Sequence, residues 1–73
     1  MGNVKKKLFE MLLIEAQAQK AKAQLTLELL SEHAAGIGDH STGDFYKNAE
    51  EALQMLVDAD DKIETLQKYY TQL

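Results

Sequence analysis

Two histidines and two aspartates gather near the middle of the chain, and their residue types could bind a metal ion. His33 and His40 flank a glycine-containing stretch, with Asp39 and Asp44 close by. Imidazole and carboxylate groups are zinc ligands, but this spacing fits no recognised ligand pattern. The same residues suit helix ends, because His in a last turn favours the helix dipole and Asp caps a helix start. We predict no metal site and no cofactor, and we keep a metal-binding helical hairpin as an alternative.

An acidic cluster lies further along the chain. It consists of Asp58, Asp60 and Asp61, followed by Glu64. Calcium loops use similar alternation but need a glycine turn and a loop conformation, whereas this cluster falls inside a helical pattern. We predict a solvated helix face that pairs with lysines.

Lys68, Tyr69 and Tyr70 could stack on a base or a nucleotide. Only one of two adjacent tyrosines can face a neighbouring helix, so the other is expected to serve a subunit interface. A small-ligand or nucleotide sequestering oligomer is therefore a second functional alternative.

The composition excludes several functional classes. The 73-residue chain has no cysteine, a net charge of −4 and 45% hydrophobic residues. The missing cysteine excludes disulfides and thiolate sites, and a mildly acidic chain lacks the basic face that nucleic-acid binding needs. No phosphate loop or Ser-His-Asp signature is present, so we predict that the protein is not an enzyme. No apolar run approaches a membrane span, and we expect a cytoplasmic protein that binds neither membrane nor nucleic acid.

Residues 4–35 are expected to form the first of the elements that must position these groups. Their apolar residues recur alternately four and three apart, a period that a strand cannot produce. The stripe consists of Phe9, Leu13, Ala16, Lys20, Ala23, Leu27, Leu30, Ala34 and Ile37. Lys20 is its one polar member, and we interpret it as a register determinant that pairs with Asp58.

A bend over residues 36–41 is expected to lead into a second helix over residues 42–72. Gly36 follows the last periodic turn, and Ser41 with Asp44 resembles a capping box. The second stripe has no polar member and consists of Phe45, Ala49, Ala52, Leu56, Ala59, Ile63, Leu66, Tyr70 and Leu73. A short connection makes neighbouring helices antiparallel. We therefore predict an all-α fold, an antiparallel two-helix hairpin that forms one domain over residues 1–73.

Folding the hairpin about residue 38 predicts which residues face each other across it. This register brings opposite charges together at four places, namely Glu28 with Lys47, Glu15 with Lys62, and both Lys20 and Lys22 with Asp58. Complementary charge supports the register independently of the apolar stripes.

A lone hairpin of this length buries one seam and leaves the apolar residues beside it exposed to water. Two hairpins that pair into a four-helix bundle, as a homodimer, would cover them. The predicted interface residues are Leu8, Phe9, Met11, Leu12, Ile14, Leu53, Val57, Ile63, Leu66, Tyr69 and Tyr70. The leading functional hypothesis is a non-enzymatic protein–protein interaction module that acts as an adaptor, inhibitor or assembly factor. An additional protein partner is left open.

Two segments carry a resemblance to a known group of proteins. They are the Ala/Gln/Lys-rich run Ile14–Leu30 and the turn Gly36-Ile37-Gly38-Asp39-His40-Ser41. In these segments the chain resembles small uncharacterised two-helix proteins of large tailed phages that infect cyanobacteria. The second helix is similar only in its acidic amphipathic character. The resemblance implies a protein made by a phage in the host cytoplasm, without known activity, and it assigns no functional residue.

Overall fold

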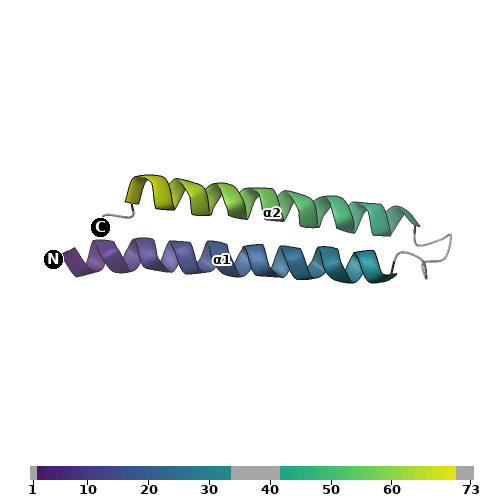
Figure 1. The fold of residues 1–73 in the computed structure, drawn as a ribbon, viewed down its shortest axis with the longest axis horizontal. Coiled ribbons are helices and arrows are strands. Elements are labelled where there is room, and N and C mark those ends of the chain that lie inside the picture. The colour runs from purple at the N-terminus through teal and green to yellow at the C-terminus, as the bar shows by residue number, and fades with distance from the viewer. Residues whose placement is uncertain (1, 34–41, 71–73) are drawn as a thin grey trace.

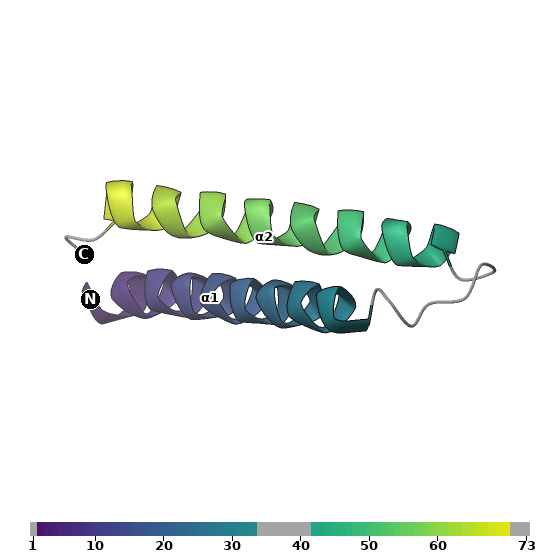
Figure 2. The same cartoon turned by 45° about the vertical axis from the view of Figure 1, so that its right-hand side comes forward.

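A computed structural model describes residues 2–33 and 42–70 of the chain, which form two helices (Figure 1). Helix α1 runs over Gly2–His33 and helix α2 over Thr42–Tyr70. The two helices pack against each other, and both views place the start of α1 near the end of α2 (Figure 1 and Figure 2). The all-helical hairpin predicted from the two stripes is confirmed. The bend predicted at residues 36–41, and the predicted helix ends at 34–35 and 71–72, lie outside the described residues.

Both helices follow from local sequence preferences as well as from packing. The chain has no proline, and the middle of α1 consists largely of Ala, Gln and Lys, which are strong helix formers. Helix α2 has Asp44 in its first turn and Lys68 in its last turn. Each of these charges interacts favourably with the nearer end of the helix dipole. Local preference and tertiary packing therefore favour the same two elements.

The seam between the helices follows the predicted stripes. In α1, every described stripe residue from Phe9 to Leu30 is buried or half-buried, including Lys20. In α2 the same holds from Phe45 to Leu66, whereas Tyr70 is 39% exposed. The buried core of the described residues consists of four alanines, Ala16, Ala23, Ala52 and Ala59. The seam is therefore narrow, with no large side chain fully enclosed among the described residues.

The predicted register is wrong by about four residues, roughly one helical turn. Lys20 Nζ lies 2.9 Å from Asp60 Oδ1 rather than near Asp58. Lys62 Nζ donates a hydrogen bond of 3.4 Å to Gln19 Oε1 rather than meeting Glu15. At the open end, the rings of Phe9 and Tyr70 stack with centroids 4.1 Å apart.

The charge pairs expected from the register predicted by sequence are not formed. Within residues 2–33 and 42–70, ion pairs link Lys7 with Glu10 and Lys20 with Asp60, and none links Glu28 with Lys47. Exposed pairs of this kind contribute only about 0–1 kcal/mol each. Stacking and apolar burial across the seam outweigh them and set the register.

Small and large residues alternate across this seam. Steps of three and four from the Phe9–Tyr70 pair set Ala16 opposite Ile63 and Ala23 opposite Leu56. In the next step Leu27 lies opposite Ala52 of α2. An alanine in each of these layers lets the two backbones approach closely. Close approach explains why the alanines are the residues that become fully buried.

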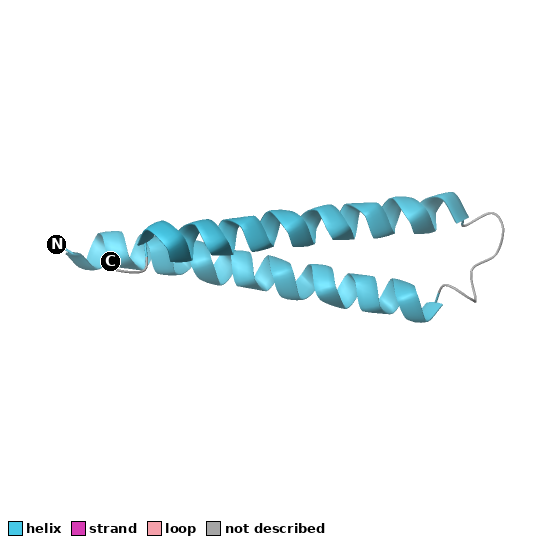
Figure 3. Ribbon diagram, turned by 45° about the horizontal axis from the view of Figure 1, so that its top comes forward, coloured by secondary structure: helices cyan, strands magenta, loops and turns pink. Residues whose placement is uncertain are grey.

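The hairpin is a thin rod whose two helices run along its length at a small angle to each other (Figure 3). Its principal extents are 57 × 14 × 14 Å. The radius of gyration is 16.5 Å, whereas a compact chain of this length has about 11 Å. Within the described part of the chain, neither helix combines the length and the hydropathy that crossing a membrane requires.

Candidate functional site

Exposed apolar side chains are the dominant surface feature of this hairpin. Among the residues that the structure describes, thirteen large ones are at least 36% exposed: Val4, Leu8, Met11, Leu12, Ile14, Leu25, Leu29, Tyr46, Leu53, Met55, Val57, Tyr69 and Tyr70. Single exposed apolar residues are normal on a soluble protein, but so many beside a core of four alanines are not. The candidate site is therefore an apolar surface rather than a pocket.

The total solvent-accessible area of the chain is larger than that of a compact protein of the same mass. The chain exposes 5823 Å². A compact monomer of 8.2 kDa is expected to expose about 4500 Å². The excess of about 1300 Å² exceeds the roughly 800 Å² that each partner loses in a standard protein–protein interface. A hairpin of this shape thus has enough spare surface for a stable interface.

The predicted interface residues divide into two groups. Phe9, Ile63 and Leu66 are half-buried within the seam, so they hold the hairpin itself together. The other eight are exposed, and they lie on more than one side of the rod. Five exposed large residues were not predicted for the interface: Val4, Leu25, Leu29, Tyr46 and Met55. Three of these five lie on α1, where a second spacing of three and four, on the side opposite the seam, could have identified them.

The open end of the hairpin carries an aromatic cluster. Tyr70 stacks on Phe9 at an interplanar angle of 12°, and Tyr69 meets Tyr70 edge to face at 6.4 Å. Lys68 Nζ lies 5.3 Å from the centroid of the Tyr69 ring, and Tyr69 is 64% exposed. As predicted, one tyrosine faces the neighbouring helix and the other faces outward.

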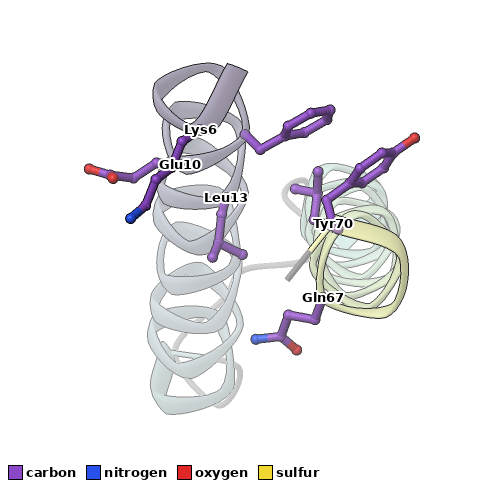
Figure 4. Close-up of a pocket in the computed structure, with 7 residues that line it drawn as sticks. Lys6, Glu10, Leu13, Gln67 and Tyr70 are labelled. Atoms are coloured by element: carbon purple, nitrogen blue, oxygen red, sulfur yellow. The ribbon is translucent and has the colours of Figure 1, made fainter. Parts of the chain in front are cut away.

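A groove of about 270 Å³ opens beside this stack. It is lined by Lys6, Phe9, Glu10, Leu13, Leu66, Gln67 and Tyr70. Leu13 turns toward the space between the helices, whereas Glu10 turns away from α2 (Figure 4). Ligand pockets usually reach about 300–1,000 Å³ and enclose most of the ligand. This groove is smaller and open, and it offers little to hold a nucleotide in place.

The metal candidates are dispersed or lie beyond the described residues. His33 ends α1, and Asp44 is exposed in the first turn of α2. Asp39 and His40 fall outside the described residues. Over the ranges 2–33 and 42–70, no group of three or more His, Asp or Glu residues is placed to hold a metal ion.

The acidic cluster of α2 has helical neighbours, as predicted, but its partners differ from the predicted ones. Gln54 Nε2 donates a hydrogen bond of 2.9 Å to Asp58 Oδ1 along the same helix. Asp60, rather than Asp58, pairs with Lys20 across the seam. The cluster thus tethers the seam at one residue and is otherwise solvated.

Comparison with protein-family models, with characterised proteins and with solved structures finds no match to this chain. The resemblance to phage proteins and the expected cytoplasmic location therefore stay predictions from sequence.

Proposed function

We propose that this protein is a non-enzymatic protein–protein interaction module that works by self-association. Its hairpins pair as a homodimer into a four-helix assembly, and this assembly acts as an adaptor, an inhibitor or an assembly factor. The observation that carries the proposal is the contrast between thirteen exposed large apolar side chains and a core of four alanines.

The energetic reason is that the seam alone gives little hydrophobic stabilisation. Apolar burial contributes about 25 cal/mol per Å², but the large seam residues, such as Phe9, Leu13 and Ile63, are only half-buried, and the residues that are fully buried are small alanines. A chain of this size without disulfides usually needs association or another constraint to fold stably. Packing a second hairpin onto the exposed apolar residues supplies the missing burial.

The charge distribution supports association in solution over aggregation. The chain carries a net charge of −4, and charged residues make up 27% of it. Net charge of this size keeps an assembly soluble, and charged residues between the apolar ones limit which contacts can form. A closed symmetric dimer covers the apolar surface of both copies, so further copies do not add to it to form a filament.

Thermal unfolding followed by circular dichroism tests the proposal. If folding is coupled to association, the melting temperature rises by several degrees over a hundredfold increase in protein concentration. A hairpin that folds alone melts at the same temperature at every concentration, and that result would overturn the proposal. The ultraviolet spectrum recorded below the transition serves as the control that the chain is helical at each concentration.

A further inference from the structure

Helix α1 has a second apolar stripe on the side opposite the seam. Its members are spaced three or four residues apart and are all exposed: Val4, Leu8, Met11, Ile14, Ala18, Ala21, Leu25 and Leu29. We call these eight residues the α1 outer face. The six large members are 47–79% exposed, and the stripe spans about 38 Å of helix.

Helix α2 offers no such stripe. The residues directly opposite its seam are polar: Lys47, Glu50, Gln54, Asp58, Asp61, Thr65 and Lys68. We call these seven residues the α2 outer face. The Gln54–Asp58 hydrogen bond lies on this side. The exposed apolar residues Leu53 and Val57 flank this polar row. A helix that is apolar on two opposite sides is typical of a helix buried between two neighbours, whereas a one-sided helix lies at the periphery.

We infer that a second copy of this chain covers the α1 outer face, with its own α1 lying antiparallel across it. This inference rests on the proposed self-association and names the surface and the arrangement that it uses. The two α1 helices lie at the centre of the assembly, and each α2 lies outside. The area argument permits one such contact, since the excess exposed surface of about 1300 Å² exceeds what a standard interface takes from each partner.

The spacing of the stripe fits an antiparallel pair of identical helices. With Leu8 opposite Leu25 of the second copy, Val4 falls opposite Leu29 of the second copy. A twofold axis repeats both contacts, so all four large end residues of each chain are covered. At the centre the same register sets Ala18 opposite Glu15 of the second copy, where the small alanine leaves room for the longer side chain.

Charges beside the stripe complement each other in this arrangement. The same register brings Lys7 beside Glu28 of the second copy, and Ile14 beside Ala21 of the second copy. The twofold axis makes each contact occur twice. Within its own chain Lys7 Nζ lies 3.7 Å from Glu10, an exposed contact that leaves the ammonium free to approach a second carboxylate.

A parallel arrangement sets like charges against like. Each residue then meets its own copy, so Glu15 lies beside Glu15, Lys22 beside Lys22, and Lys7 beside Lys7 of the second copy. Repulsion between like charges disfavours such contacts. The charge pattern therefore selects the antiparallel orientation.

Disulfide trapping tests the arrangement cleanly because the chain has no cysteine. Three variants are oxidised and run on a non-reducing gel: Leu8→Cys, Leu25→Cys, and the double variant. An intrachain bond is impossible in the double variant, since seventeen residues of helix separate the two positions by about 26 Å and a disulfide spans less than about 7 Å. We expect the double variant to run as a covalent dimer and each single variant to stay a single chain. The matched control is Gln54→Cys with Asp61→Cys, which places two thiols on the α2 outer face and is expected to give no dimer.

The other outcomes each overturn the inference. Covalent dimers of the single variants would show a parallel contact. A wild-type chain of dimeric mass whose double variant stays uncrosslinked would place the interface elsewhere and leave the proposed self-association intact. A wild-type chain of monomeric mass would remove both the inference and the proposed function.

Discussion

The two helices of this hairpin share one seam but present opposite kinds of surface to their outer sides. The α1 outer face is apolar from Val4 to Leu29, whereas the α2 outer face is polar from Lys47 to Lys68. Their seam sides are alike, since both carry the same spacing of three and four and both bury alanines. Both helices expose large apolar residues, but only α1 has a row of them directly opposite its seam. The proposed association therefore uses the α1 outer face.

The largest effect is expected when the same change, alanine to aspartate, is made on each of the two sides of α1. Ala23 is fully buried in the seam, and Ala18 lies exposed at the centre of the α1 outer face. Ala23→Asp puts an uncompensated charge into the seam, which costs about 3–5 kcal/mol, and we expect loss of the helical circular dichroism signal. Ala18→Asp should leave the helical signal in place at high protein concentration and raise the concentration below which the dimer dissociates. Equal loss of helix in both variants would show that the two sides of α1 do not have separate roles.

The next largest effect is expected when one leucine of each helix is replaced, the two leucines having nearly equal exposed fractions. Leu25 on α1 is 56% exposed and Leu53 on α2 is 54% exposed. Leu25→Gln removes apolar contact from two symmetric positions of the dimer, and we expect the dissociation constant to rise about thirtyfold or more. Leu53→Gln should change it by no more than about twofold, because single surface substitutions away from an interface have small effects. Sedimentation equilibrium measures both constants. Equal weakening by the two variants would bring α2 into the interface and end the contrast between the helices.

The sequence predicts those features of the fold that depend on residues close together in the chain. The seam was predictable from Phe9 to Leu66, because the spacing of apolar residues is a local property of each helix. The register was not, because it depends on interactions across the hairpin. The charges that suggested it, such as Glu15 and Lys62, contribute too little to fix it. Stacking of Phe9 on Tyr70 at the far end is a contact between distant residues that no local pattern contains.

The candidate surface was only partly predictable for a related reason. Leu8, Met11, Leu12 and Ile14 near the start of α1 were predicted for the interface, but Val4, Leu25 and Leu29, which are also exposed, were left out of it. Ala18 and Ala21 lie between Ile14 and Leu25, in the middle of α1 where Ala, Gln and Lys favour helix formation. Small residues contribute to a contact by letting backbones approach, and this role becomes visible once the side of the helix that is left uncovered is known.

A smaller effect on the free energy of unfolding is expected when two neighbouring aspartates of α2 are replaced in turn. Asp60 Oδ1 lies 2.9 Å from Lys20 Nζ, whereas Asp61 belongs to the α2 outer face. Asp60→Asn is expected to lower the free energy of unfolding by less than about 1 kcal/mol at low salt, because the pair is half-exposed. The loss should shrink in concentrated salt, where screening weakens the pair in the wild-type chain. Chemical denaturation with urea at two salt concentrations measures it. A salt-dependent loss of equal size for Asp61→Asn would show that net charge, rather than the seam pair, is responsible.

The smallest effect separates stability of the hairpin from association. Gly43 lies in the first turn of α2, has no positive φ, and has open space around an added Cβ. Gly43→Ala is expected to raise the free energy of unfolding by about 0.5 kcal/mol, because alanine loses less backbone entropy in a helix. Its molar mass at equal concentration should match that of the wild-type chain. A change in mass would mean that the start of α2 takes part in the assembly.

The most direct test of the whole account is the molar mass of the wild-type chain, measured by light scattering on a sizing column over a hundredfold dilution. The account predicts twice the 8.2 kDa of one chain at high concentration, with dissociation toward a single chain only on dilution. A mass of 8.2 kDa at every concentration would contradict it, because the α1 outer face would then remain uncovered in a folded protein.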